Sequence, residues 1–422
     1  MKFFISSIPF FDTKMVVQAY RLVTQTGDKL LGAAEDFRMI NNMLQTPALD
    51  YVEHIGVEPF AGSCDFFVDF GKYQLLMGKP IGLGIPPEKL ICVVDRSVLS
   101  DNAICLKLDV LKKNGYRLAV EGMPKGVSMK VVTGYFDYLL LSFRDGNLSG
   151  TLKDIRPYLA KIKLVVTDVP DRRSFMRFAD VKDVLLTGDF YRQPITVGEV
   201  RVSPLKINSL ELLRHINDED FDLITAAATI ERDPALSISL LRFINSGSGR
   251  KAANKIESIR GAVAVLGQKE VRKWATVAIS VGLGADRPGE ITRHSLIRAK
   301  FAENLATAYE IGLSSGNLFI AGLFSMLDLM LEMPMYKAVD EVAVNQDVKN
   351  ALVNQKGPIY EVLSLIYAYE RADWDTASLN IIRNGLDVDT VTSAFLGAML
   401  WYRQLLDSID EEKRAEEGIG AV

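Results

Sequence analysis

The hydrophobic periodicity of this chain changes near residue 200, and that change limits the fold more than any other feature of the sequence. Before it, short apolar runs of strand length alternate with stretches of helical periodicity, whereas after it the apolar positions follow the helical repeat throughout. A chain of 422 residues is also too long for one compact core, and 48% hydrophobic residues are enough to fill two. We therefore predict an α/β domain over residues 1–199, an all-α domain over residues 200–407, and a charged flexible tail over residues 408–422.

The first half contains eight candidate strands. They span residues 2–8, 16–23, 65–70, 89–95, 117–121, 137–143, 162–168 and 182–187. Helical stretches lie between several of them, at 98–114, 151–160 and 171–180, and this alternation predicts a TIM-like barrel. Only residues 9–15 join the first two strands, whereas a parallel crossover needs a dozen or more residues. The first strand is therefore expected to run antiparallel to the second.

Four short segments of this half carry a resemblance to a known family. They are residues 17–23, 115–120, 137–139 and 188–194. In these segments, and in the order of its elements, the first half resembles the EAL domain, a barrel family that hydrolyses cyclic di-GMP. The resemblance implies an active-site region at the carboxyl ends of the strands.

The resemblance places the family's metal-binding and catalytic positions mostly on residues that lack the required chemistry. The metal-binding acid of the Glu-Ala-Leu motif falls on Arg21, whose cation would repel a divalent ion. The other matched positions are Asp69, Cys92 or Val93, Glu121 with Gly122, Leu140 in place of the catalytic Lys, Ser142, and Thr167. A divalent ion needs several oxygen ligands at fixed geometry, which this set does not supply. We therefore expect no catalytic residue, no metal site and no cofactor in the barrel.

Four acids nevertheless fall near the predicted carboxyl ends of strands. They are Asp69, Asp95, Glu121 and Asp168. One alternative is a rearranged magnesium site built from these side chains. The other, which is the commoner use of isolated acids at strand ends, is solvation or pairing with Lys and Arg. The second interpretation is favoured here.

The second half is predicted to be helical throughout. Its helices are expected at 209–216, 219–231, 234–245, 258–266, 269–284, 290–311, 317–332, 335–342, 346–355, 358–370, 375–384 and 388–407. One of them carries clear start and end signals. Asp233 can cap the free backbone N–H groups and Pro234 suits the first helical position, while Asn245 and Ser246 mark the end. Within this helix, Leu236 and Leu240 share one apolar face.

Residues 233–246 and 256–267 resemble the two signatures of the HDOD family of bacterial signalling domains. In the second segment, Gly267 can adopt the left-handed conformation that ends a helix. The resemblance extends to His294, which stands before Ser295 where the family has His-Ser.

HDOD domains look like HD-type phosphohydrolases that have lost their metal site, and this sequence fits that loss. Such a site needs imidazole and carboxylate donors, including an adjacent His-Asp pair. At the matching position this chain has Ser325 and Met326. The resemblance therefore implies no metal site in the helical half.

Composition excludes several classes of function. A net charge of −4 and a pI near 5.7 give no general attraction to nucleic acid. No stretch approaches the roughly 18 apolar residues of a spanning helix, and the N-terminus lacks a signal peptide's apolar run. We therefore expect a cytoplasmic chain with neither nucleic-acid binding nor membrane insertion.

Two classes of function remain open. The favoured one is a non-enzymatic signalling scaffold in which a degenerate EAL barrel and an HDOD domain dock other signalling proteins, with self-association into a homo-oligomer left open. The alternative is a cyclic di-GMP receptor, or a weak metal-dependent cyclic di-GMP phosphodiesterase, in which the barrel mouth still holds the dinucleotide.

Overall fold

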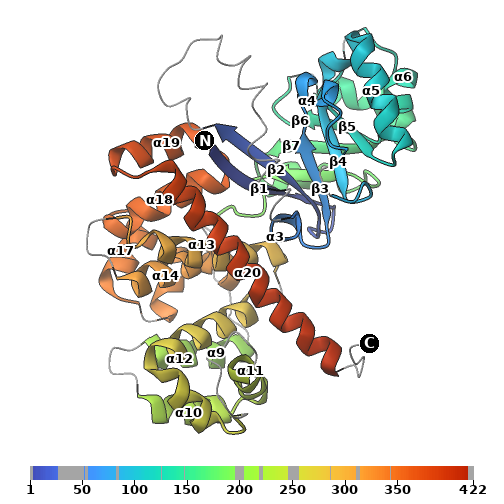
Figure 1. The fold of residues 1–422 in the computed structure, drawn as a ribbon. Coiled ribbons are helices and arrows are strands. Elements are labelled where there is room, and N and C mark those ends of the chain that lie inside the picture. Colours follow the sequence, from blue (N-terminus) through green and yellow to red (C-terminus); the bar gives the residue numbers. More distant parts are fainter. Residues whose placement is uncertain are drawn as a thin grey trace. The chain divides into compact units, whose positions relative to one another are not determined.

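The chain divides into two compact units (Figure 1). Unit 1 comprises Met1–Gln193 and Leu365–Ser393, and unit 2 comprises Pro194–Ser364 and Ala394–Val422. The structure is a computed structural model, and it describes residues 3–26, 52, 56–81, 85–124, 126–146, 148–194, 204–217, 222–245, 256–285, 287–309, 314–342 and 344–416. Among these residues, no helix has both the length and the apolar character needed to cross a membrane.

Unit 1 is built on a closed eight-stranded barrel in which each strand pairs with its neighbour in sequence. The strands are β1 (Phe3–Phe11), β2 (Val17–Thr26), β3 (Asp65–Asp69), β4 (Leu90–Asp95), β5 (Arg117–Glu121), β6 (Tyr138–Ser142), β7 (Lys163–Val169) and β8 (Leu185–Gly188). β1 is antiparallel to both β2 and β8, and the other pairs are parallel. The predicted barrel with an antiparallel first strand is confirmed.

Short helices connect the parallel strands. They are α3 (Glu58–Ala61), α4 (Lys72–Leu76), η2 (Arg96–Ser100), α5 (Asn102–Lys113), α6 (Met129–Tyr135), α7 (Leu148–Ile155), η3 (Arg156–Tyr158) and α8 (Arg172–Met176). α5 shows why the chain folds this way locally, because Asp101 caps its start by accepting from the backbone N–H groups of Ala103 and Ile104. Its apolar face buries Leu108 and Leu111.

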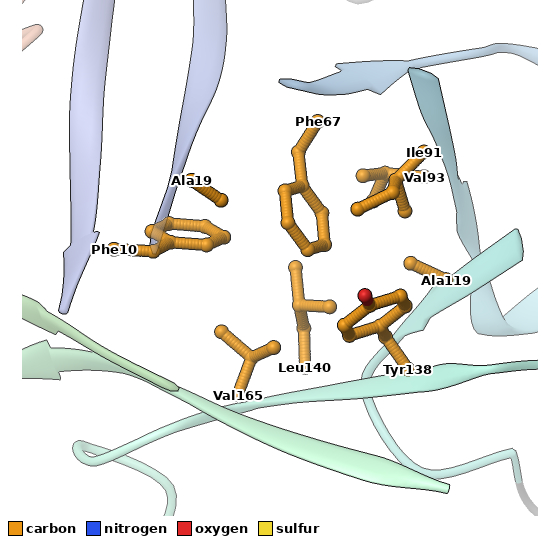
Figure 2. Packing of buried hydrophobic residues seen from close by; sticks show 9 residues of the cluster. All are labelled: Phe10, Ala19, Phe67, Ile91, Val93, Ala119, Tyr138, Leu140 and Val165. Carbon is orange, nitrogen blue, oxygen red and sulfur yellow. The ribbon is translucent and has the colours of Figure 1, made fainter. Parts of the chain in front are cut away.

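The barrel interior is filled by side chains that alternate along the strands (Figure 2). The buried cluster consists of Phe10, Ala19, Phe67, Ile91, Val93, Ala119, Tyr138, Leu140 and Val165. Because successive side chains of a strand point to opposite faces, the positions two residues further along these strands face the carboxyl end of the same interior. The packed interior therefore lies directly beneath any site at the carboxyl end of the barrel.

Unit 1 also contains a segment from near the end of the chain. This segment includes the end of α18 (Pro358–Glu370), all of α19 (Trp374–Arg383) and the start of α20 (Val388–Glu416). Phe4 of β1 stacks on Trp374, and the backbone N–H of Ile5 donates to the Tyr369 hydroxyl at 3.3 Å. The structure thus groups residues 365–393 with the barrel, whereas the sequence placed them in the helical range 200–407.

Ion pairs join the same segment to the end of the barrel sequence. The Arg192 side chain donates to Asp189 at 2.7 Å and lies 4.0 Å from Glu370, while Arg371 lies 3.6 Å from Asp189. Segment 188–194, which carried part of the family resemblance, therefore contacts residues far along the chain.

The described part of unit 2 is helical. It holds α9 (Pro204–Asn217), α10 (Leu223–Glu231), α11 (Pro234–Asn245), α12 (Ile259–Leu283), α13 (Gly289–Leu305), α14 (Ser315–Phe324), α15 (Leu327–Leu331), α16 (Met335–Ala338), η4 (Val339–Glu341), α17 (Gln346–Asn354), and the remaining parts of α18 and α20. Gly267 interrupts α12 with φ 77° and ψ 167°, where the sequence predicted a helix end. α20 continues to Glu416, beyond its predicted end at 407.

Candidate functional site at the barrel mouth

The acids singled out in the sequence lie along one rim of the barrel. Asp69, Asp95 and Glu121 are the last residues of β3, β4 and β5, and Asp168 is the penultimate residue of β7. Since the carboxyl ends of parallel strands lie at the same end of a barrel, these side chains share one rim. We call this rim, together with Arg21 of β2 and Ser142 at the end of β6, the barrel mouth.

Arg21 crosses the barrel mouth and binds two carboxylates at once. Its Nε and Nη2 donate to the two oxygens of Asp69 at 3.3 and 2.6 Å. Its Nη1 and Nη2 donate to the two oxygens of Glu121 at 2.8 and 2.9 Å. The planar guanidinium fork matches the geometry of a carboxylate, so both contacts are bidentate. Two of the four acids are therefore paired with an arginine.

A charged triad is formed by Arg21, Asp69 and Glu121. Burial in the barrel and the neighbouring charges shift the pKa of Arg21 and of Asp69. Burial alone would lower the pKa of Arg21, but the charges and hydrogen bonds of Asp69 and Glu121 raise it overall, so the guanidinium stays charged. Burial raises the pKa of Asp69, against the opposite effect of Arg21, and the charge of Glu121 adds to the rise. One cation thus offsets two carboxylates, and the triad retains a negative charge when both acids are ionised.

The Asp95 side chain contacts the residues that directly follow it in the chain. Its carboxylate accepts from the backbone N–H of Ser97 at 2.8 Å and caps η2. Burial alone would raise the pKa of Asp95, but the hydrogen bonds from Ser97 and the charges of Arg96 and Lys72 lower it overall. This carboxylate is accordingly held at the start of the helix.

Asp168 sits in a backbone conformation that few residues adopt. Its φ is 59°, in the left-handed region, at the irregular end of the β7–β8 pairing. One oxygen accepts from the Ser142 hydroxyl at 2.6 Å and from the Thr167 hydroxyl at 3.1 Å. Ser142 and Thr167 are partners in the β6–β7 register, which brings the two hydroxyls together. This group of Asp168, Ser142 and Thr167 was not predicted from the sequence, although register counting along β6 and β7 could have indicated it.

Among the other matched positions, Leu140 and Val93 carry apolar side chains, Cys92 carries a thiol and Gly122 has no side chain. Leu140 and Val93 belong to the buried interior cluster, which identifies Val93 rather than Cys92 as the inward-facing residue (Figure 2). Burial raises the pKa of the Cys92 thiol and keeps it protonated. Gly122 has φ 79°, and its N–H donates to the carbonyl of Leu140 at 2.8 Å.

A divalent ion does not fit the described arrangement of these residues. Among the residues that the structure describes, no three His, Cys, Asp or Glu side chains form a group able to hold a metal ion. The carboxylates of Asp69 and Glu121 meet at the barrel mouth, but their four oxygens all accept from Arg21. The functional roles of the matched positions stay a prediction.

In the helical unit, the signature residues Asp233 and Asn245 make hydrogen bonds to backbone groups. Asp233 accepts from the backbone N–H of Leu236 at 3.1 Å and so caps α11, in which Leu240 is fully buried. The Asn245 side chain accepts from the N–H of Ile256 and donates to its carbonyl, both at 2.8 Å. Ser246 lies outside the described residues.

His294 belongs to a buried polar group on α13. One carboxylate oxygen of Glu290 accepts from Arg293 at 2.7 Å and lies 3.2 Å from the His294 ring nitrogen. Just after α14, the Ser325 hydroxyl accepts from Arg298 at 3.0 Å and donates to the Gly322 carbonyl at 2.6 Å. A hydroxyl bonded to an arginine thus stands where the family resemblance placed the lost His-Asp pair.

Comparison with known proteins identifies the helical unit. The model of the HDOD domain matches residues 204–354, so this part of the chain is an HDOD domain. The predicted architecture, a barrel with an antiparallel first strand followed by an HDOD domain, is confirmed by the closed barrel together with this match.

Two curated relatives match along nearly the whole chain. The cyclic di-GMP phosphodiesterase CdgJ of Vibrio cholerae is 23% identical, over 95% of this chain and 93% of its own. The uncharacterized protein YuxH of Bacillus subtilis is 26% identical, over 97% of this chain and all of its own. Among solved structures, the Klebsiella pneumoniae BlrP1 complex with calcium and cyclic di-GMP matches with a TM-score of 0.35 and 12% identity, over 44% of this chain and 54% of that one.

One expectation from the sequence is contradicted. The lost catalytic positions suggested that the chain is not an enzyme, yet a relative spanning nearly all of it is named as a phosphodiesterase. Matching single positions to a motif assumes that a site can be built in one way, whereas one fold can carry different arrangements of functional residues. The expectation of a non-enzyme is therefore withdrawn.

Proposed function

We propose that this chain, a barrel followed by an HDOD domain, is a cyclic di-GMP signalling protein whose barrel mouth binds the dinucleotide. The observation that carries the proposal is the match of 95% of the chain to a protein named as a cyclic di-GMP phosphodiesterase. Both the barrel and the helical unit fall within that match, so the proposal concerns the whole two-domain protein.

The chemistry of the mouth supports a ligand with phosphodiester groups. Arg21 offers a guanidinium fork, the side chain best suited to bidentate contact with a phosphate. Ser142 and Thr167 add hydroxyls on the same rim. The ligand's negative charge is opposed by Asp69, Glu121 and Asp168, so we expect binding to strengthen as the ionic strength of the buffer rises modestly or as divalent cations are added.

A second candidate function is hydrolysis of cyclic di-GMP at the same mouth. The observation in its favour is the relative's name, combined with four carboxylates at the ends of β3, β4, β5 and β7. Hydrolysis and binding share one location and are separated by whether a linear product appears.

The test is a calorimetric titration of the full chain with cyclic di-GMP, with and without magnesium, followed by chromatography for the linear product. Binding supports the first proposal, and product formation adds the second. Absence of heat under both conditions would overturn the proposal of a cyclic di-GMP site. The matched pair of variants is Arg21→Ala at the mouth and Arg117→Ala at the opposite end of the barrel, where Arg117 pairs with Asp65 at 2.7 Å. Binding should weaken in the first and persist in the second.

We also propose that the HDOD unit docks other signalling proteins and leave self-association to be measured. Among the described side chains of α10, α11 and α12, the exposed large apolar ones include Ile224, Ile238 and Val265. Exposed apolar side chains favour association when they gather on one surface. Sedimentation velocity on the wild type and on an Ile224→Glu, Ile238→Glu variant tests self-association, and an unchanged sedimentation coefficient would argue against a role of these two side chains in it.

A further inference from the structure

We propose that Arg21 is a built-in cation of the barrel mouth that competes with divalent metal ions for the carboxylates of Asp69 and Glu121. It follows from the observation that a divalent ion does not fit the described arrangement of these residues. All four carboxylate oxygens accept hydrogen bonds from the one guanidinium, at distances from 2.6 to 3.3 Å. The guanidinium thus already stands at the point toward which both carboxylates converge.

The pair has the chemistry of a cation site. Asp69 and Glu121 come from β3 and β5, on either side of β4, and the barrel holds both at its rim. Carboxylate oxygens are the ligands that magnesium, manganese and calcium prefer. The two side chains are 36% and 48% exposed, so a hydrated ion can reach them from solvent.

Arg21 opposes such an ion in two ways. Its hydrogen bonds occupy the oxygens that the ion would coordinate, and its positive charge repels a second cation at short range. Its own side chain is only 15% exposed, which shields these contacts from competing water. Removing the guanidinium should therefore leave two converging carboxylates and raise the affinity for a divalent ion.

The barrel contains an internal control for this idea. At the amino ends of β3 and β5, Arg117 makes a bidentate contact with Asp65 at 2.7 and 2.9 Å. That contact joins the same two strands but involves one carboxylate instead of two. Removing Arg117 leaves a single acid, which is too few ligands for a divalent ion.

The decisive experiment measures binding of manganese to the full chain by the electron paramagnetic resonance signal of the free ion. Arg21→Gln should bind manganese at least about tenfold more tightly than the wild type, because charge-assisted hydrogen bonds of this kind are strong enough to shift an affinity that far. Arg117→Gln should bind like the wild type. Adding Asp69→Asn and Glu121→Gln to Arg21→Gln should abolish the gain.

A second variant keeps the test valid if Arg21→Gln does not fold. Arg21→Lys keeps the charge but cannot bridge both carboxylates bidentately, so its manganese affinity should lie between those of the wild type and Arg21→Gln. Circular dichroism and thermal melting identify which variants are folded. If either folded variant binds manganese no better than the wild type, the competition does not exist.

The same competition predicts regulation by the ligand, and this step rests on the proposed binding of cyclic di-GMP. A phosphodiester that accepts from Arg21 would draw the guanidinium away from its carboxylates and free them. Manganese affinity of the wild type should then rise when cyclic di-GMP is present, and by linkage manganese should tighten cyclic di-GMP binding by the same factor.

The proposed metal competition and the proposed cyclic di-GMP binding can be refuted independently. If the wild type binds no cyclic di-GMP but Arg21→Gln gains manganese affinity, the competition stands and the proposed ligand is wrong. If cyclic di-GMP binds and Arg21→Gln gains nothing, the ligand stands and the competition is wrong. Equal manganese affinity of the wild type with and without bound cyclic di-GMP would overturn the regulatory step.

Discussion

Phe4 of the first barrel strand stacks on Trp374, with ring centroids 5.2 Å apart and an interplanar angle of 10°. The two residues are separated by most of the chain, yet they belong to one compact unit. Tyr369 completes the contact, since its ring lies edge-on to Phe4 at 6.0 Å and to Trp374 at 5.3 Å. Burial raises the pKa of Tyr369 to about 12, so its hydroxyl stays protonated and available to Ile5 and Thr392.

Truncating Trp374 should destabilise the barrel unit. Trp374→Ala removes a buried ring from the face of Phe4 and should cost about 3–5 kcal/mol of unfolding free energy. Leu379→Ala, on the same helix α19 and 68% exposed, is the matched control and should stay within about 0.5 kcal/mol. Urea denaturation followed by far-ultraviolet circular dichroism measures both. Equal midpoints would mean that the aromatic contact contributes little.

Two glycines of the helical unit should respond oppositely to alanine. A Cβ added at Gly322 of α14 would lie 2.5 Å from the backbone oxygen of Arg298 in α13, so Gly322→Ala should cost about 1–3 kcal/mol. Gly282 lies in α12 with nothing within 4 Å of an added Cβ. Gly282→Ala should stabilise the protein by roughly 0.5–1 kcal/mol, because alanine has the higher helix propensity. Thermal melts of both variants test the close approach of α13 to α14, and a tolerated Gly322→Ala would count against it.

Replacing Asn245 should loosen the segment before α12. Asn245→Ala removes the two hydrogen bonds to the backbone of Ile256 and should cost about 1 kcal/mol. The specific signature is faster hydrogen exchange at the Ile256 amide. Asn380→Ala is the control, since that side chain donates to Thr376 of its own helix at 2.9 Å. Unchanged exchange at Ile256 would show that the amide is protected by other means.

Glu303 should make the helical unit sensitive to acid. Burial alone would raise the pKa of Glu303, but hydrogen bonds from Lys273 and Lys300, each at 2.8 Å, lower it overall. A lowered native pKa stabilises the fold fully above the unfolded value of 4.5, and this contribution is lost as pH falls through the native pKa. Glu303→Gln should therefore be less stable than the wild type at pH 7 by about 1 kcal/mol, and the difference should shrink as pH falls through the native pKa of Glu303. A constant difference across this range would refute the linkage.

Much of the barrel could be predicted from the sequence because its strands are apolar runs bounded by turns and helices. All eight strands lie within a few residues of their expected positions, and the short connection from β1 to β2 revealed the antiparallel pair. Helices α3, α4 and α6 were not predicted, since four to seven residues are too few to show a helical repeat.

The site was harder to predict than the fold. The sequence singled out Arg21, Asp69 and Glu121 but not the contacts between them. The two acids lie 48 and 100 residues away from Arg21 and meet it only through barrel closure. Similarly, the helical periodicity of residues 375–384 predicted α19 but carried no information about what it packs against. The prediction that the chain is not an enzyme is contradicted, and it relied on matching individual positions to catalytic residues of the resembled families.

The contact between Phe4 and the late helices has a genetic consequence. The HDOD match ends at residue 354, whereas the residues that complete the barrel unit begin at Leu365. A nonsense codon placed between these points would spare the matched HDOD sequence and every barrel strand, yet strip β1 of its aromatic partners. Alleles that disable the barrel can therefore map to codons downstream of the matched HDOD sequence, and a gene fragment that complements them must encode residues 365–393.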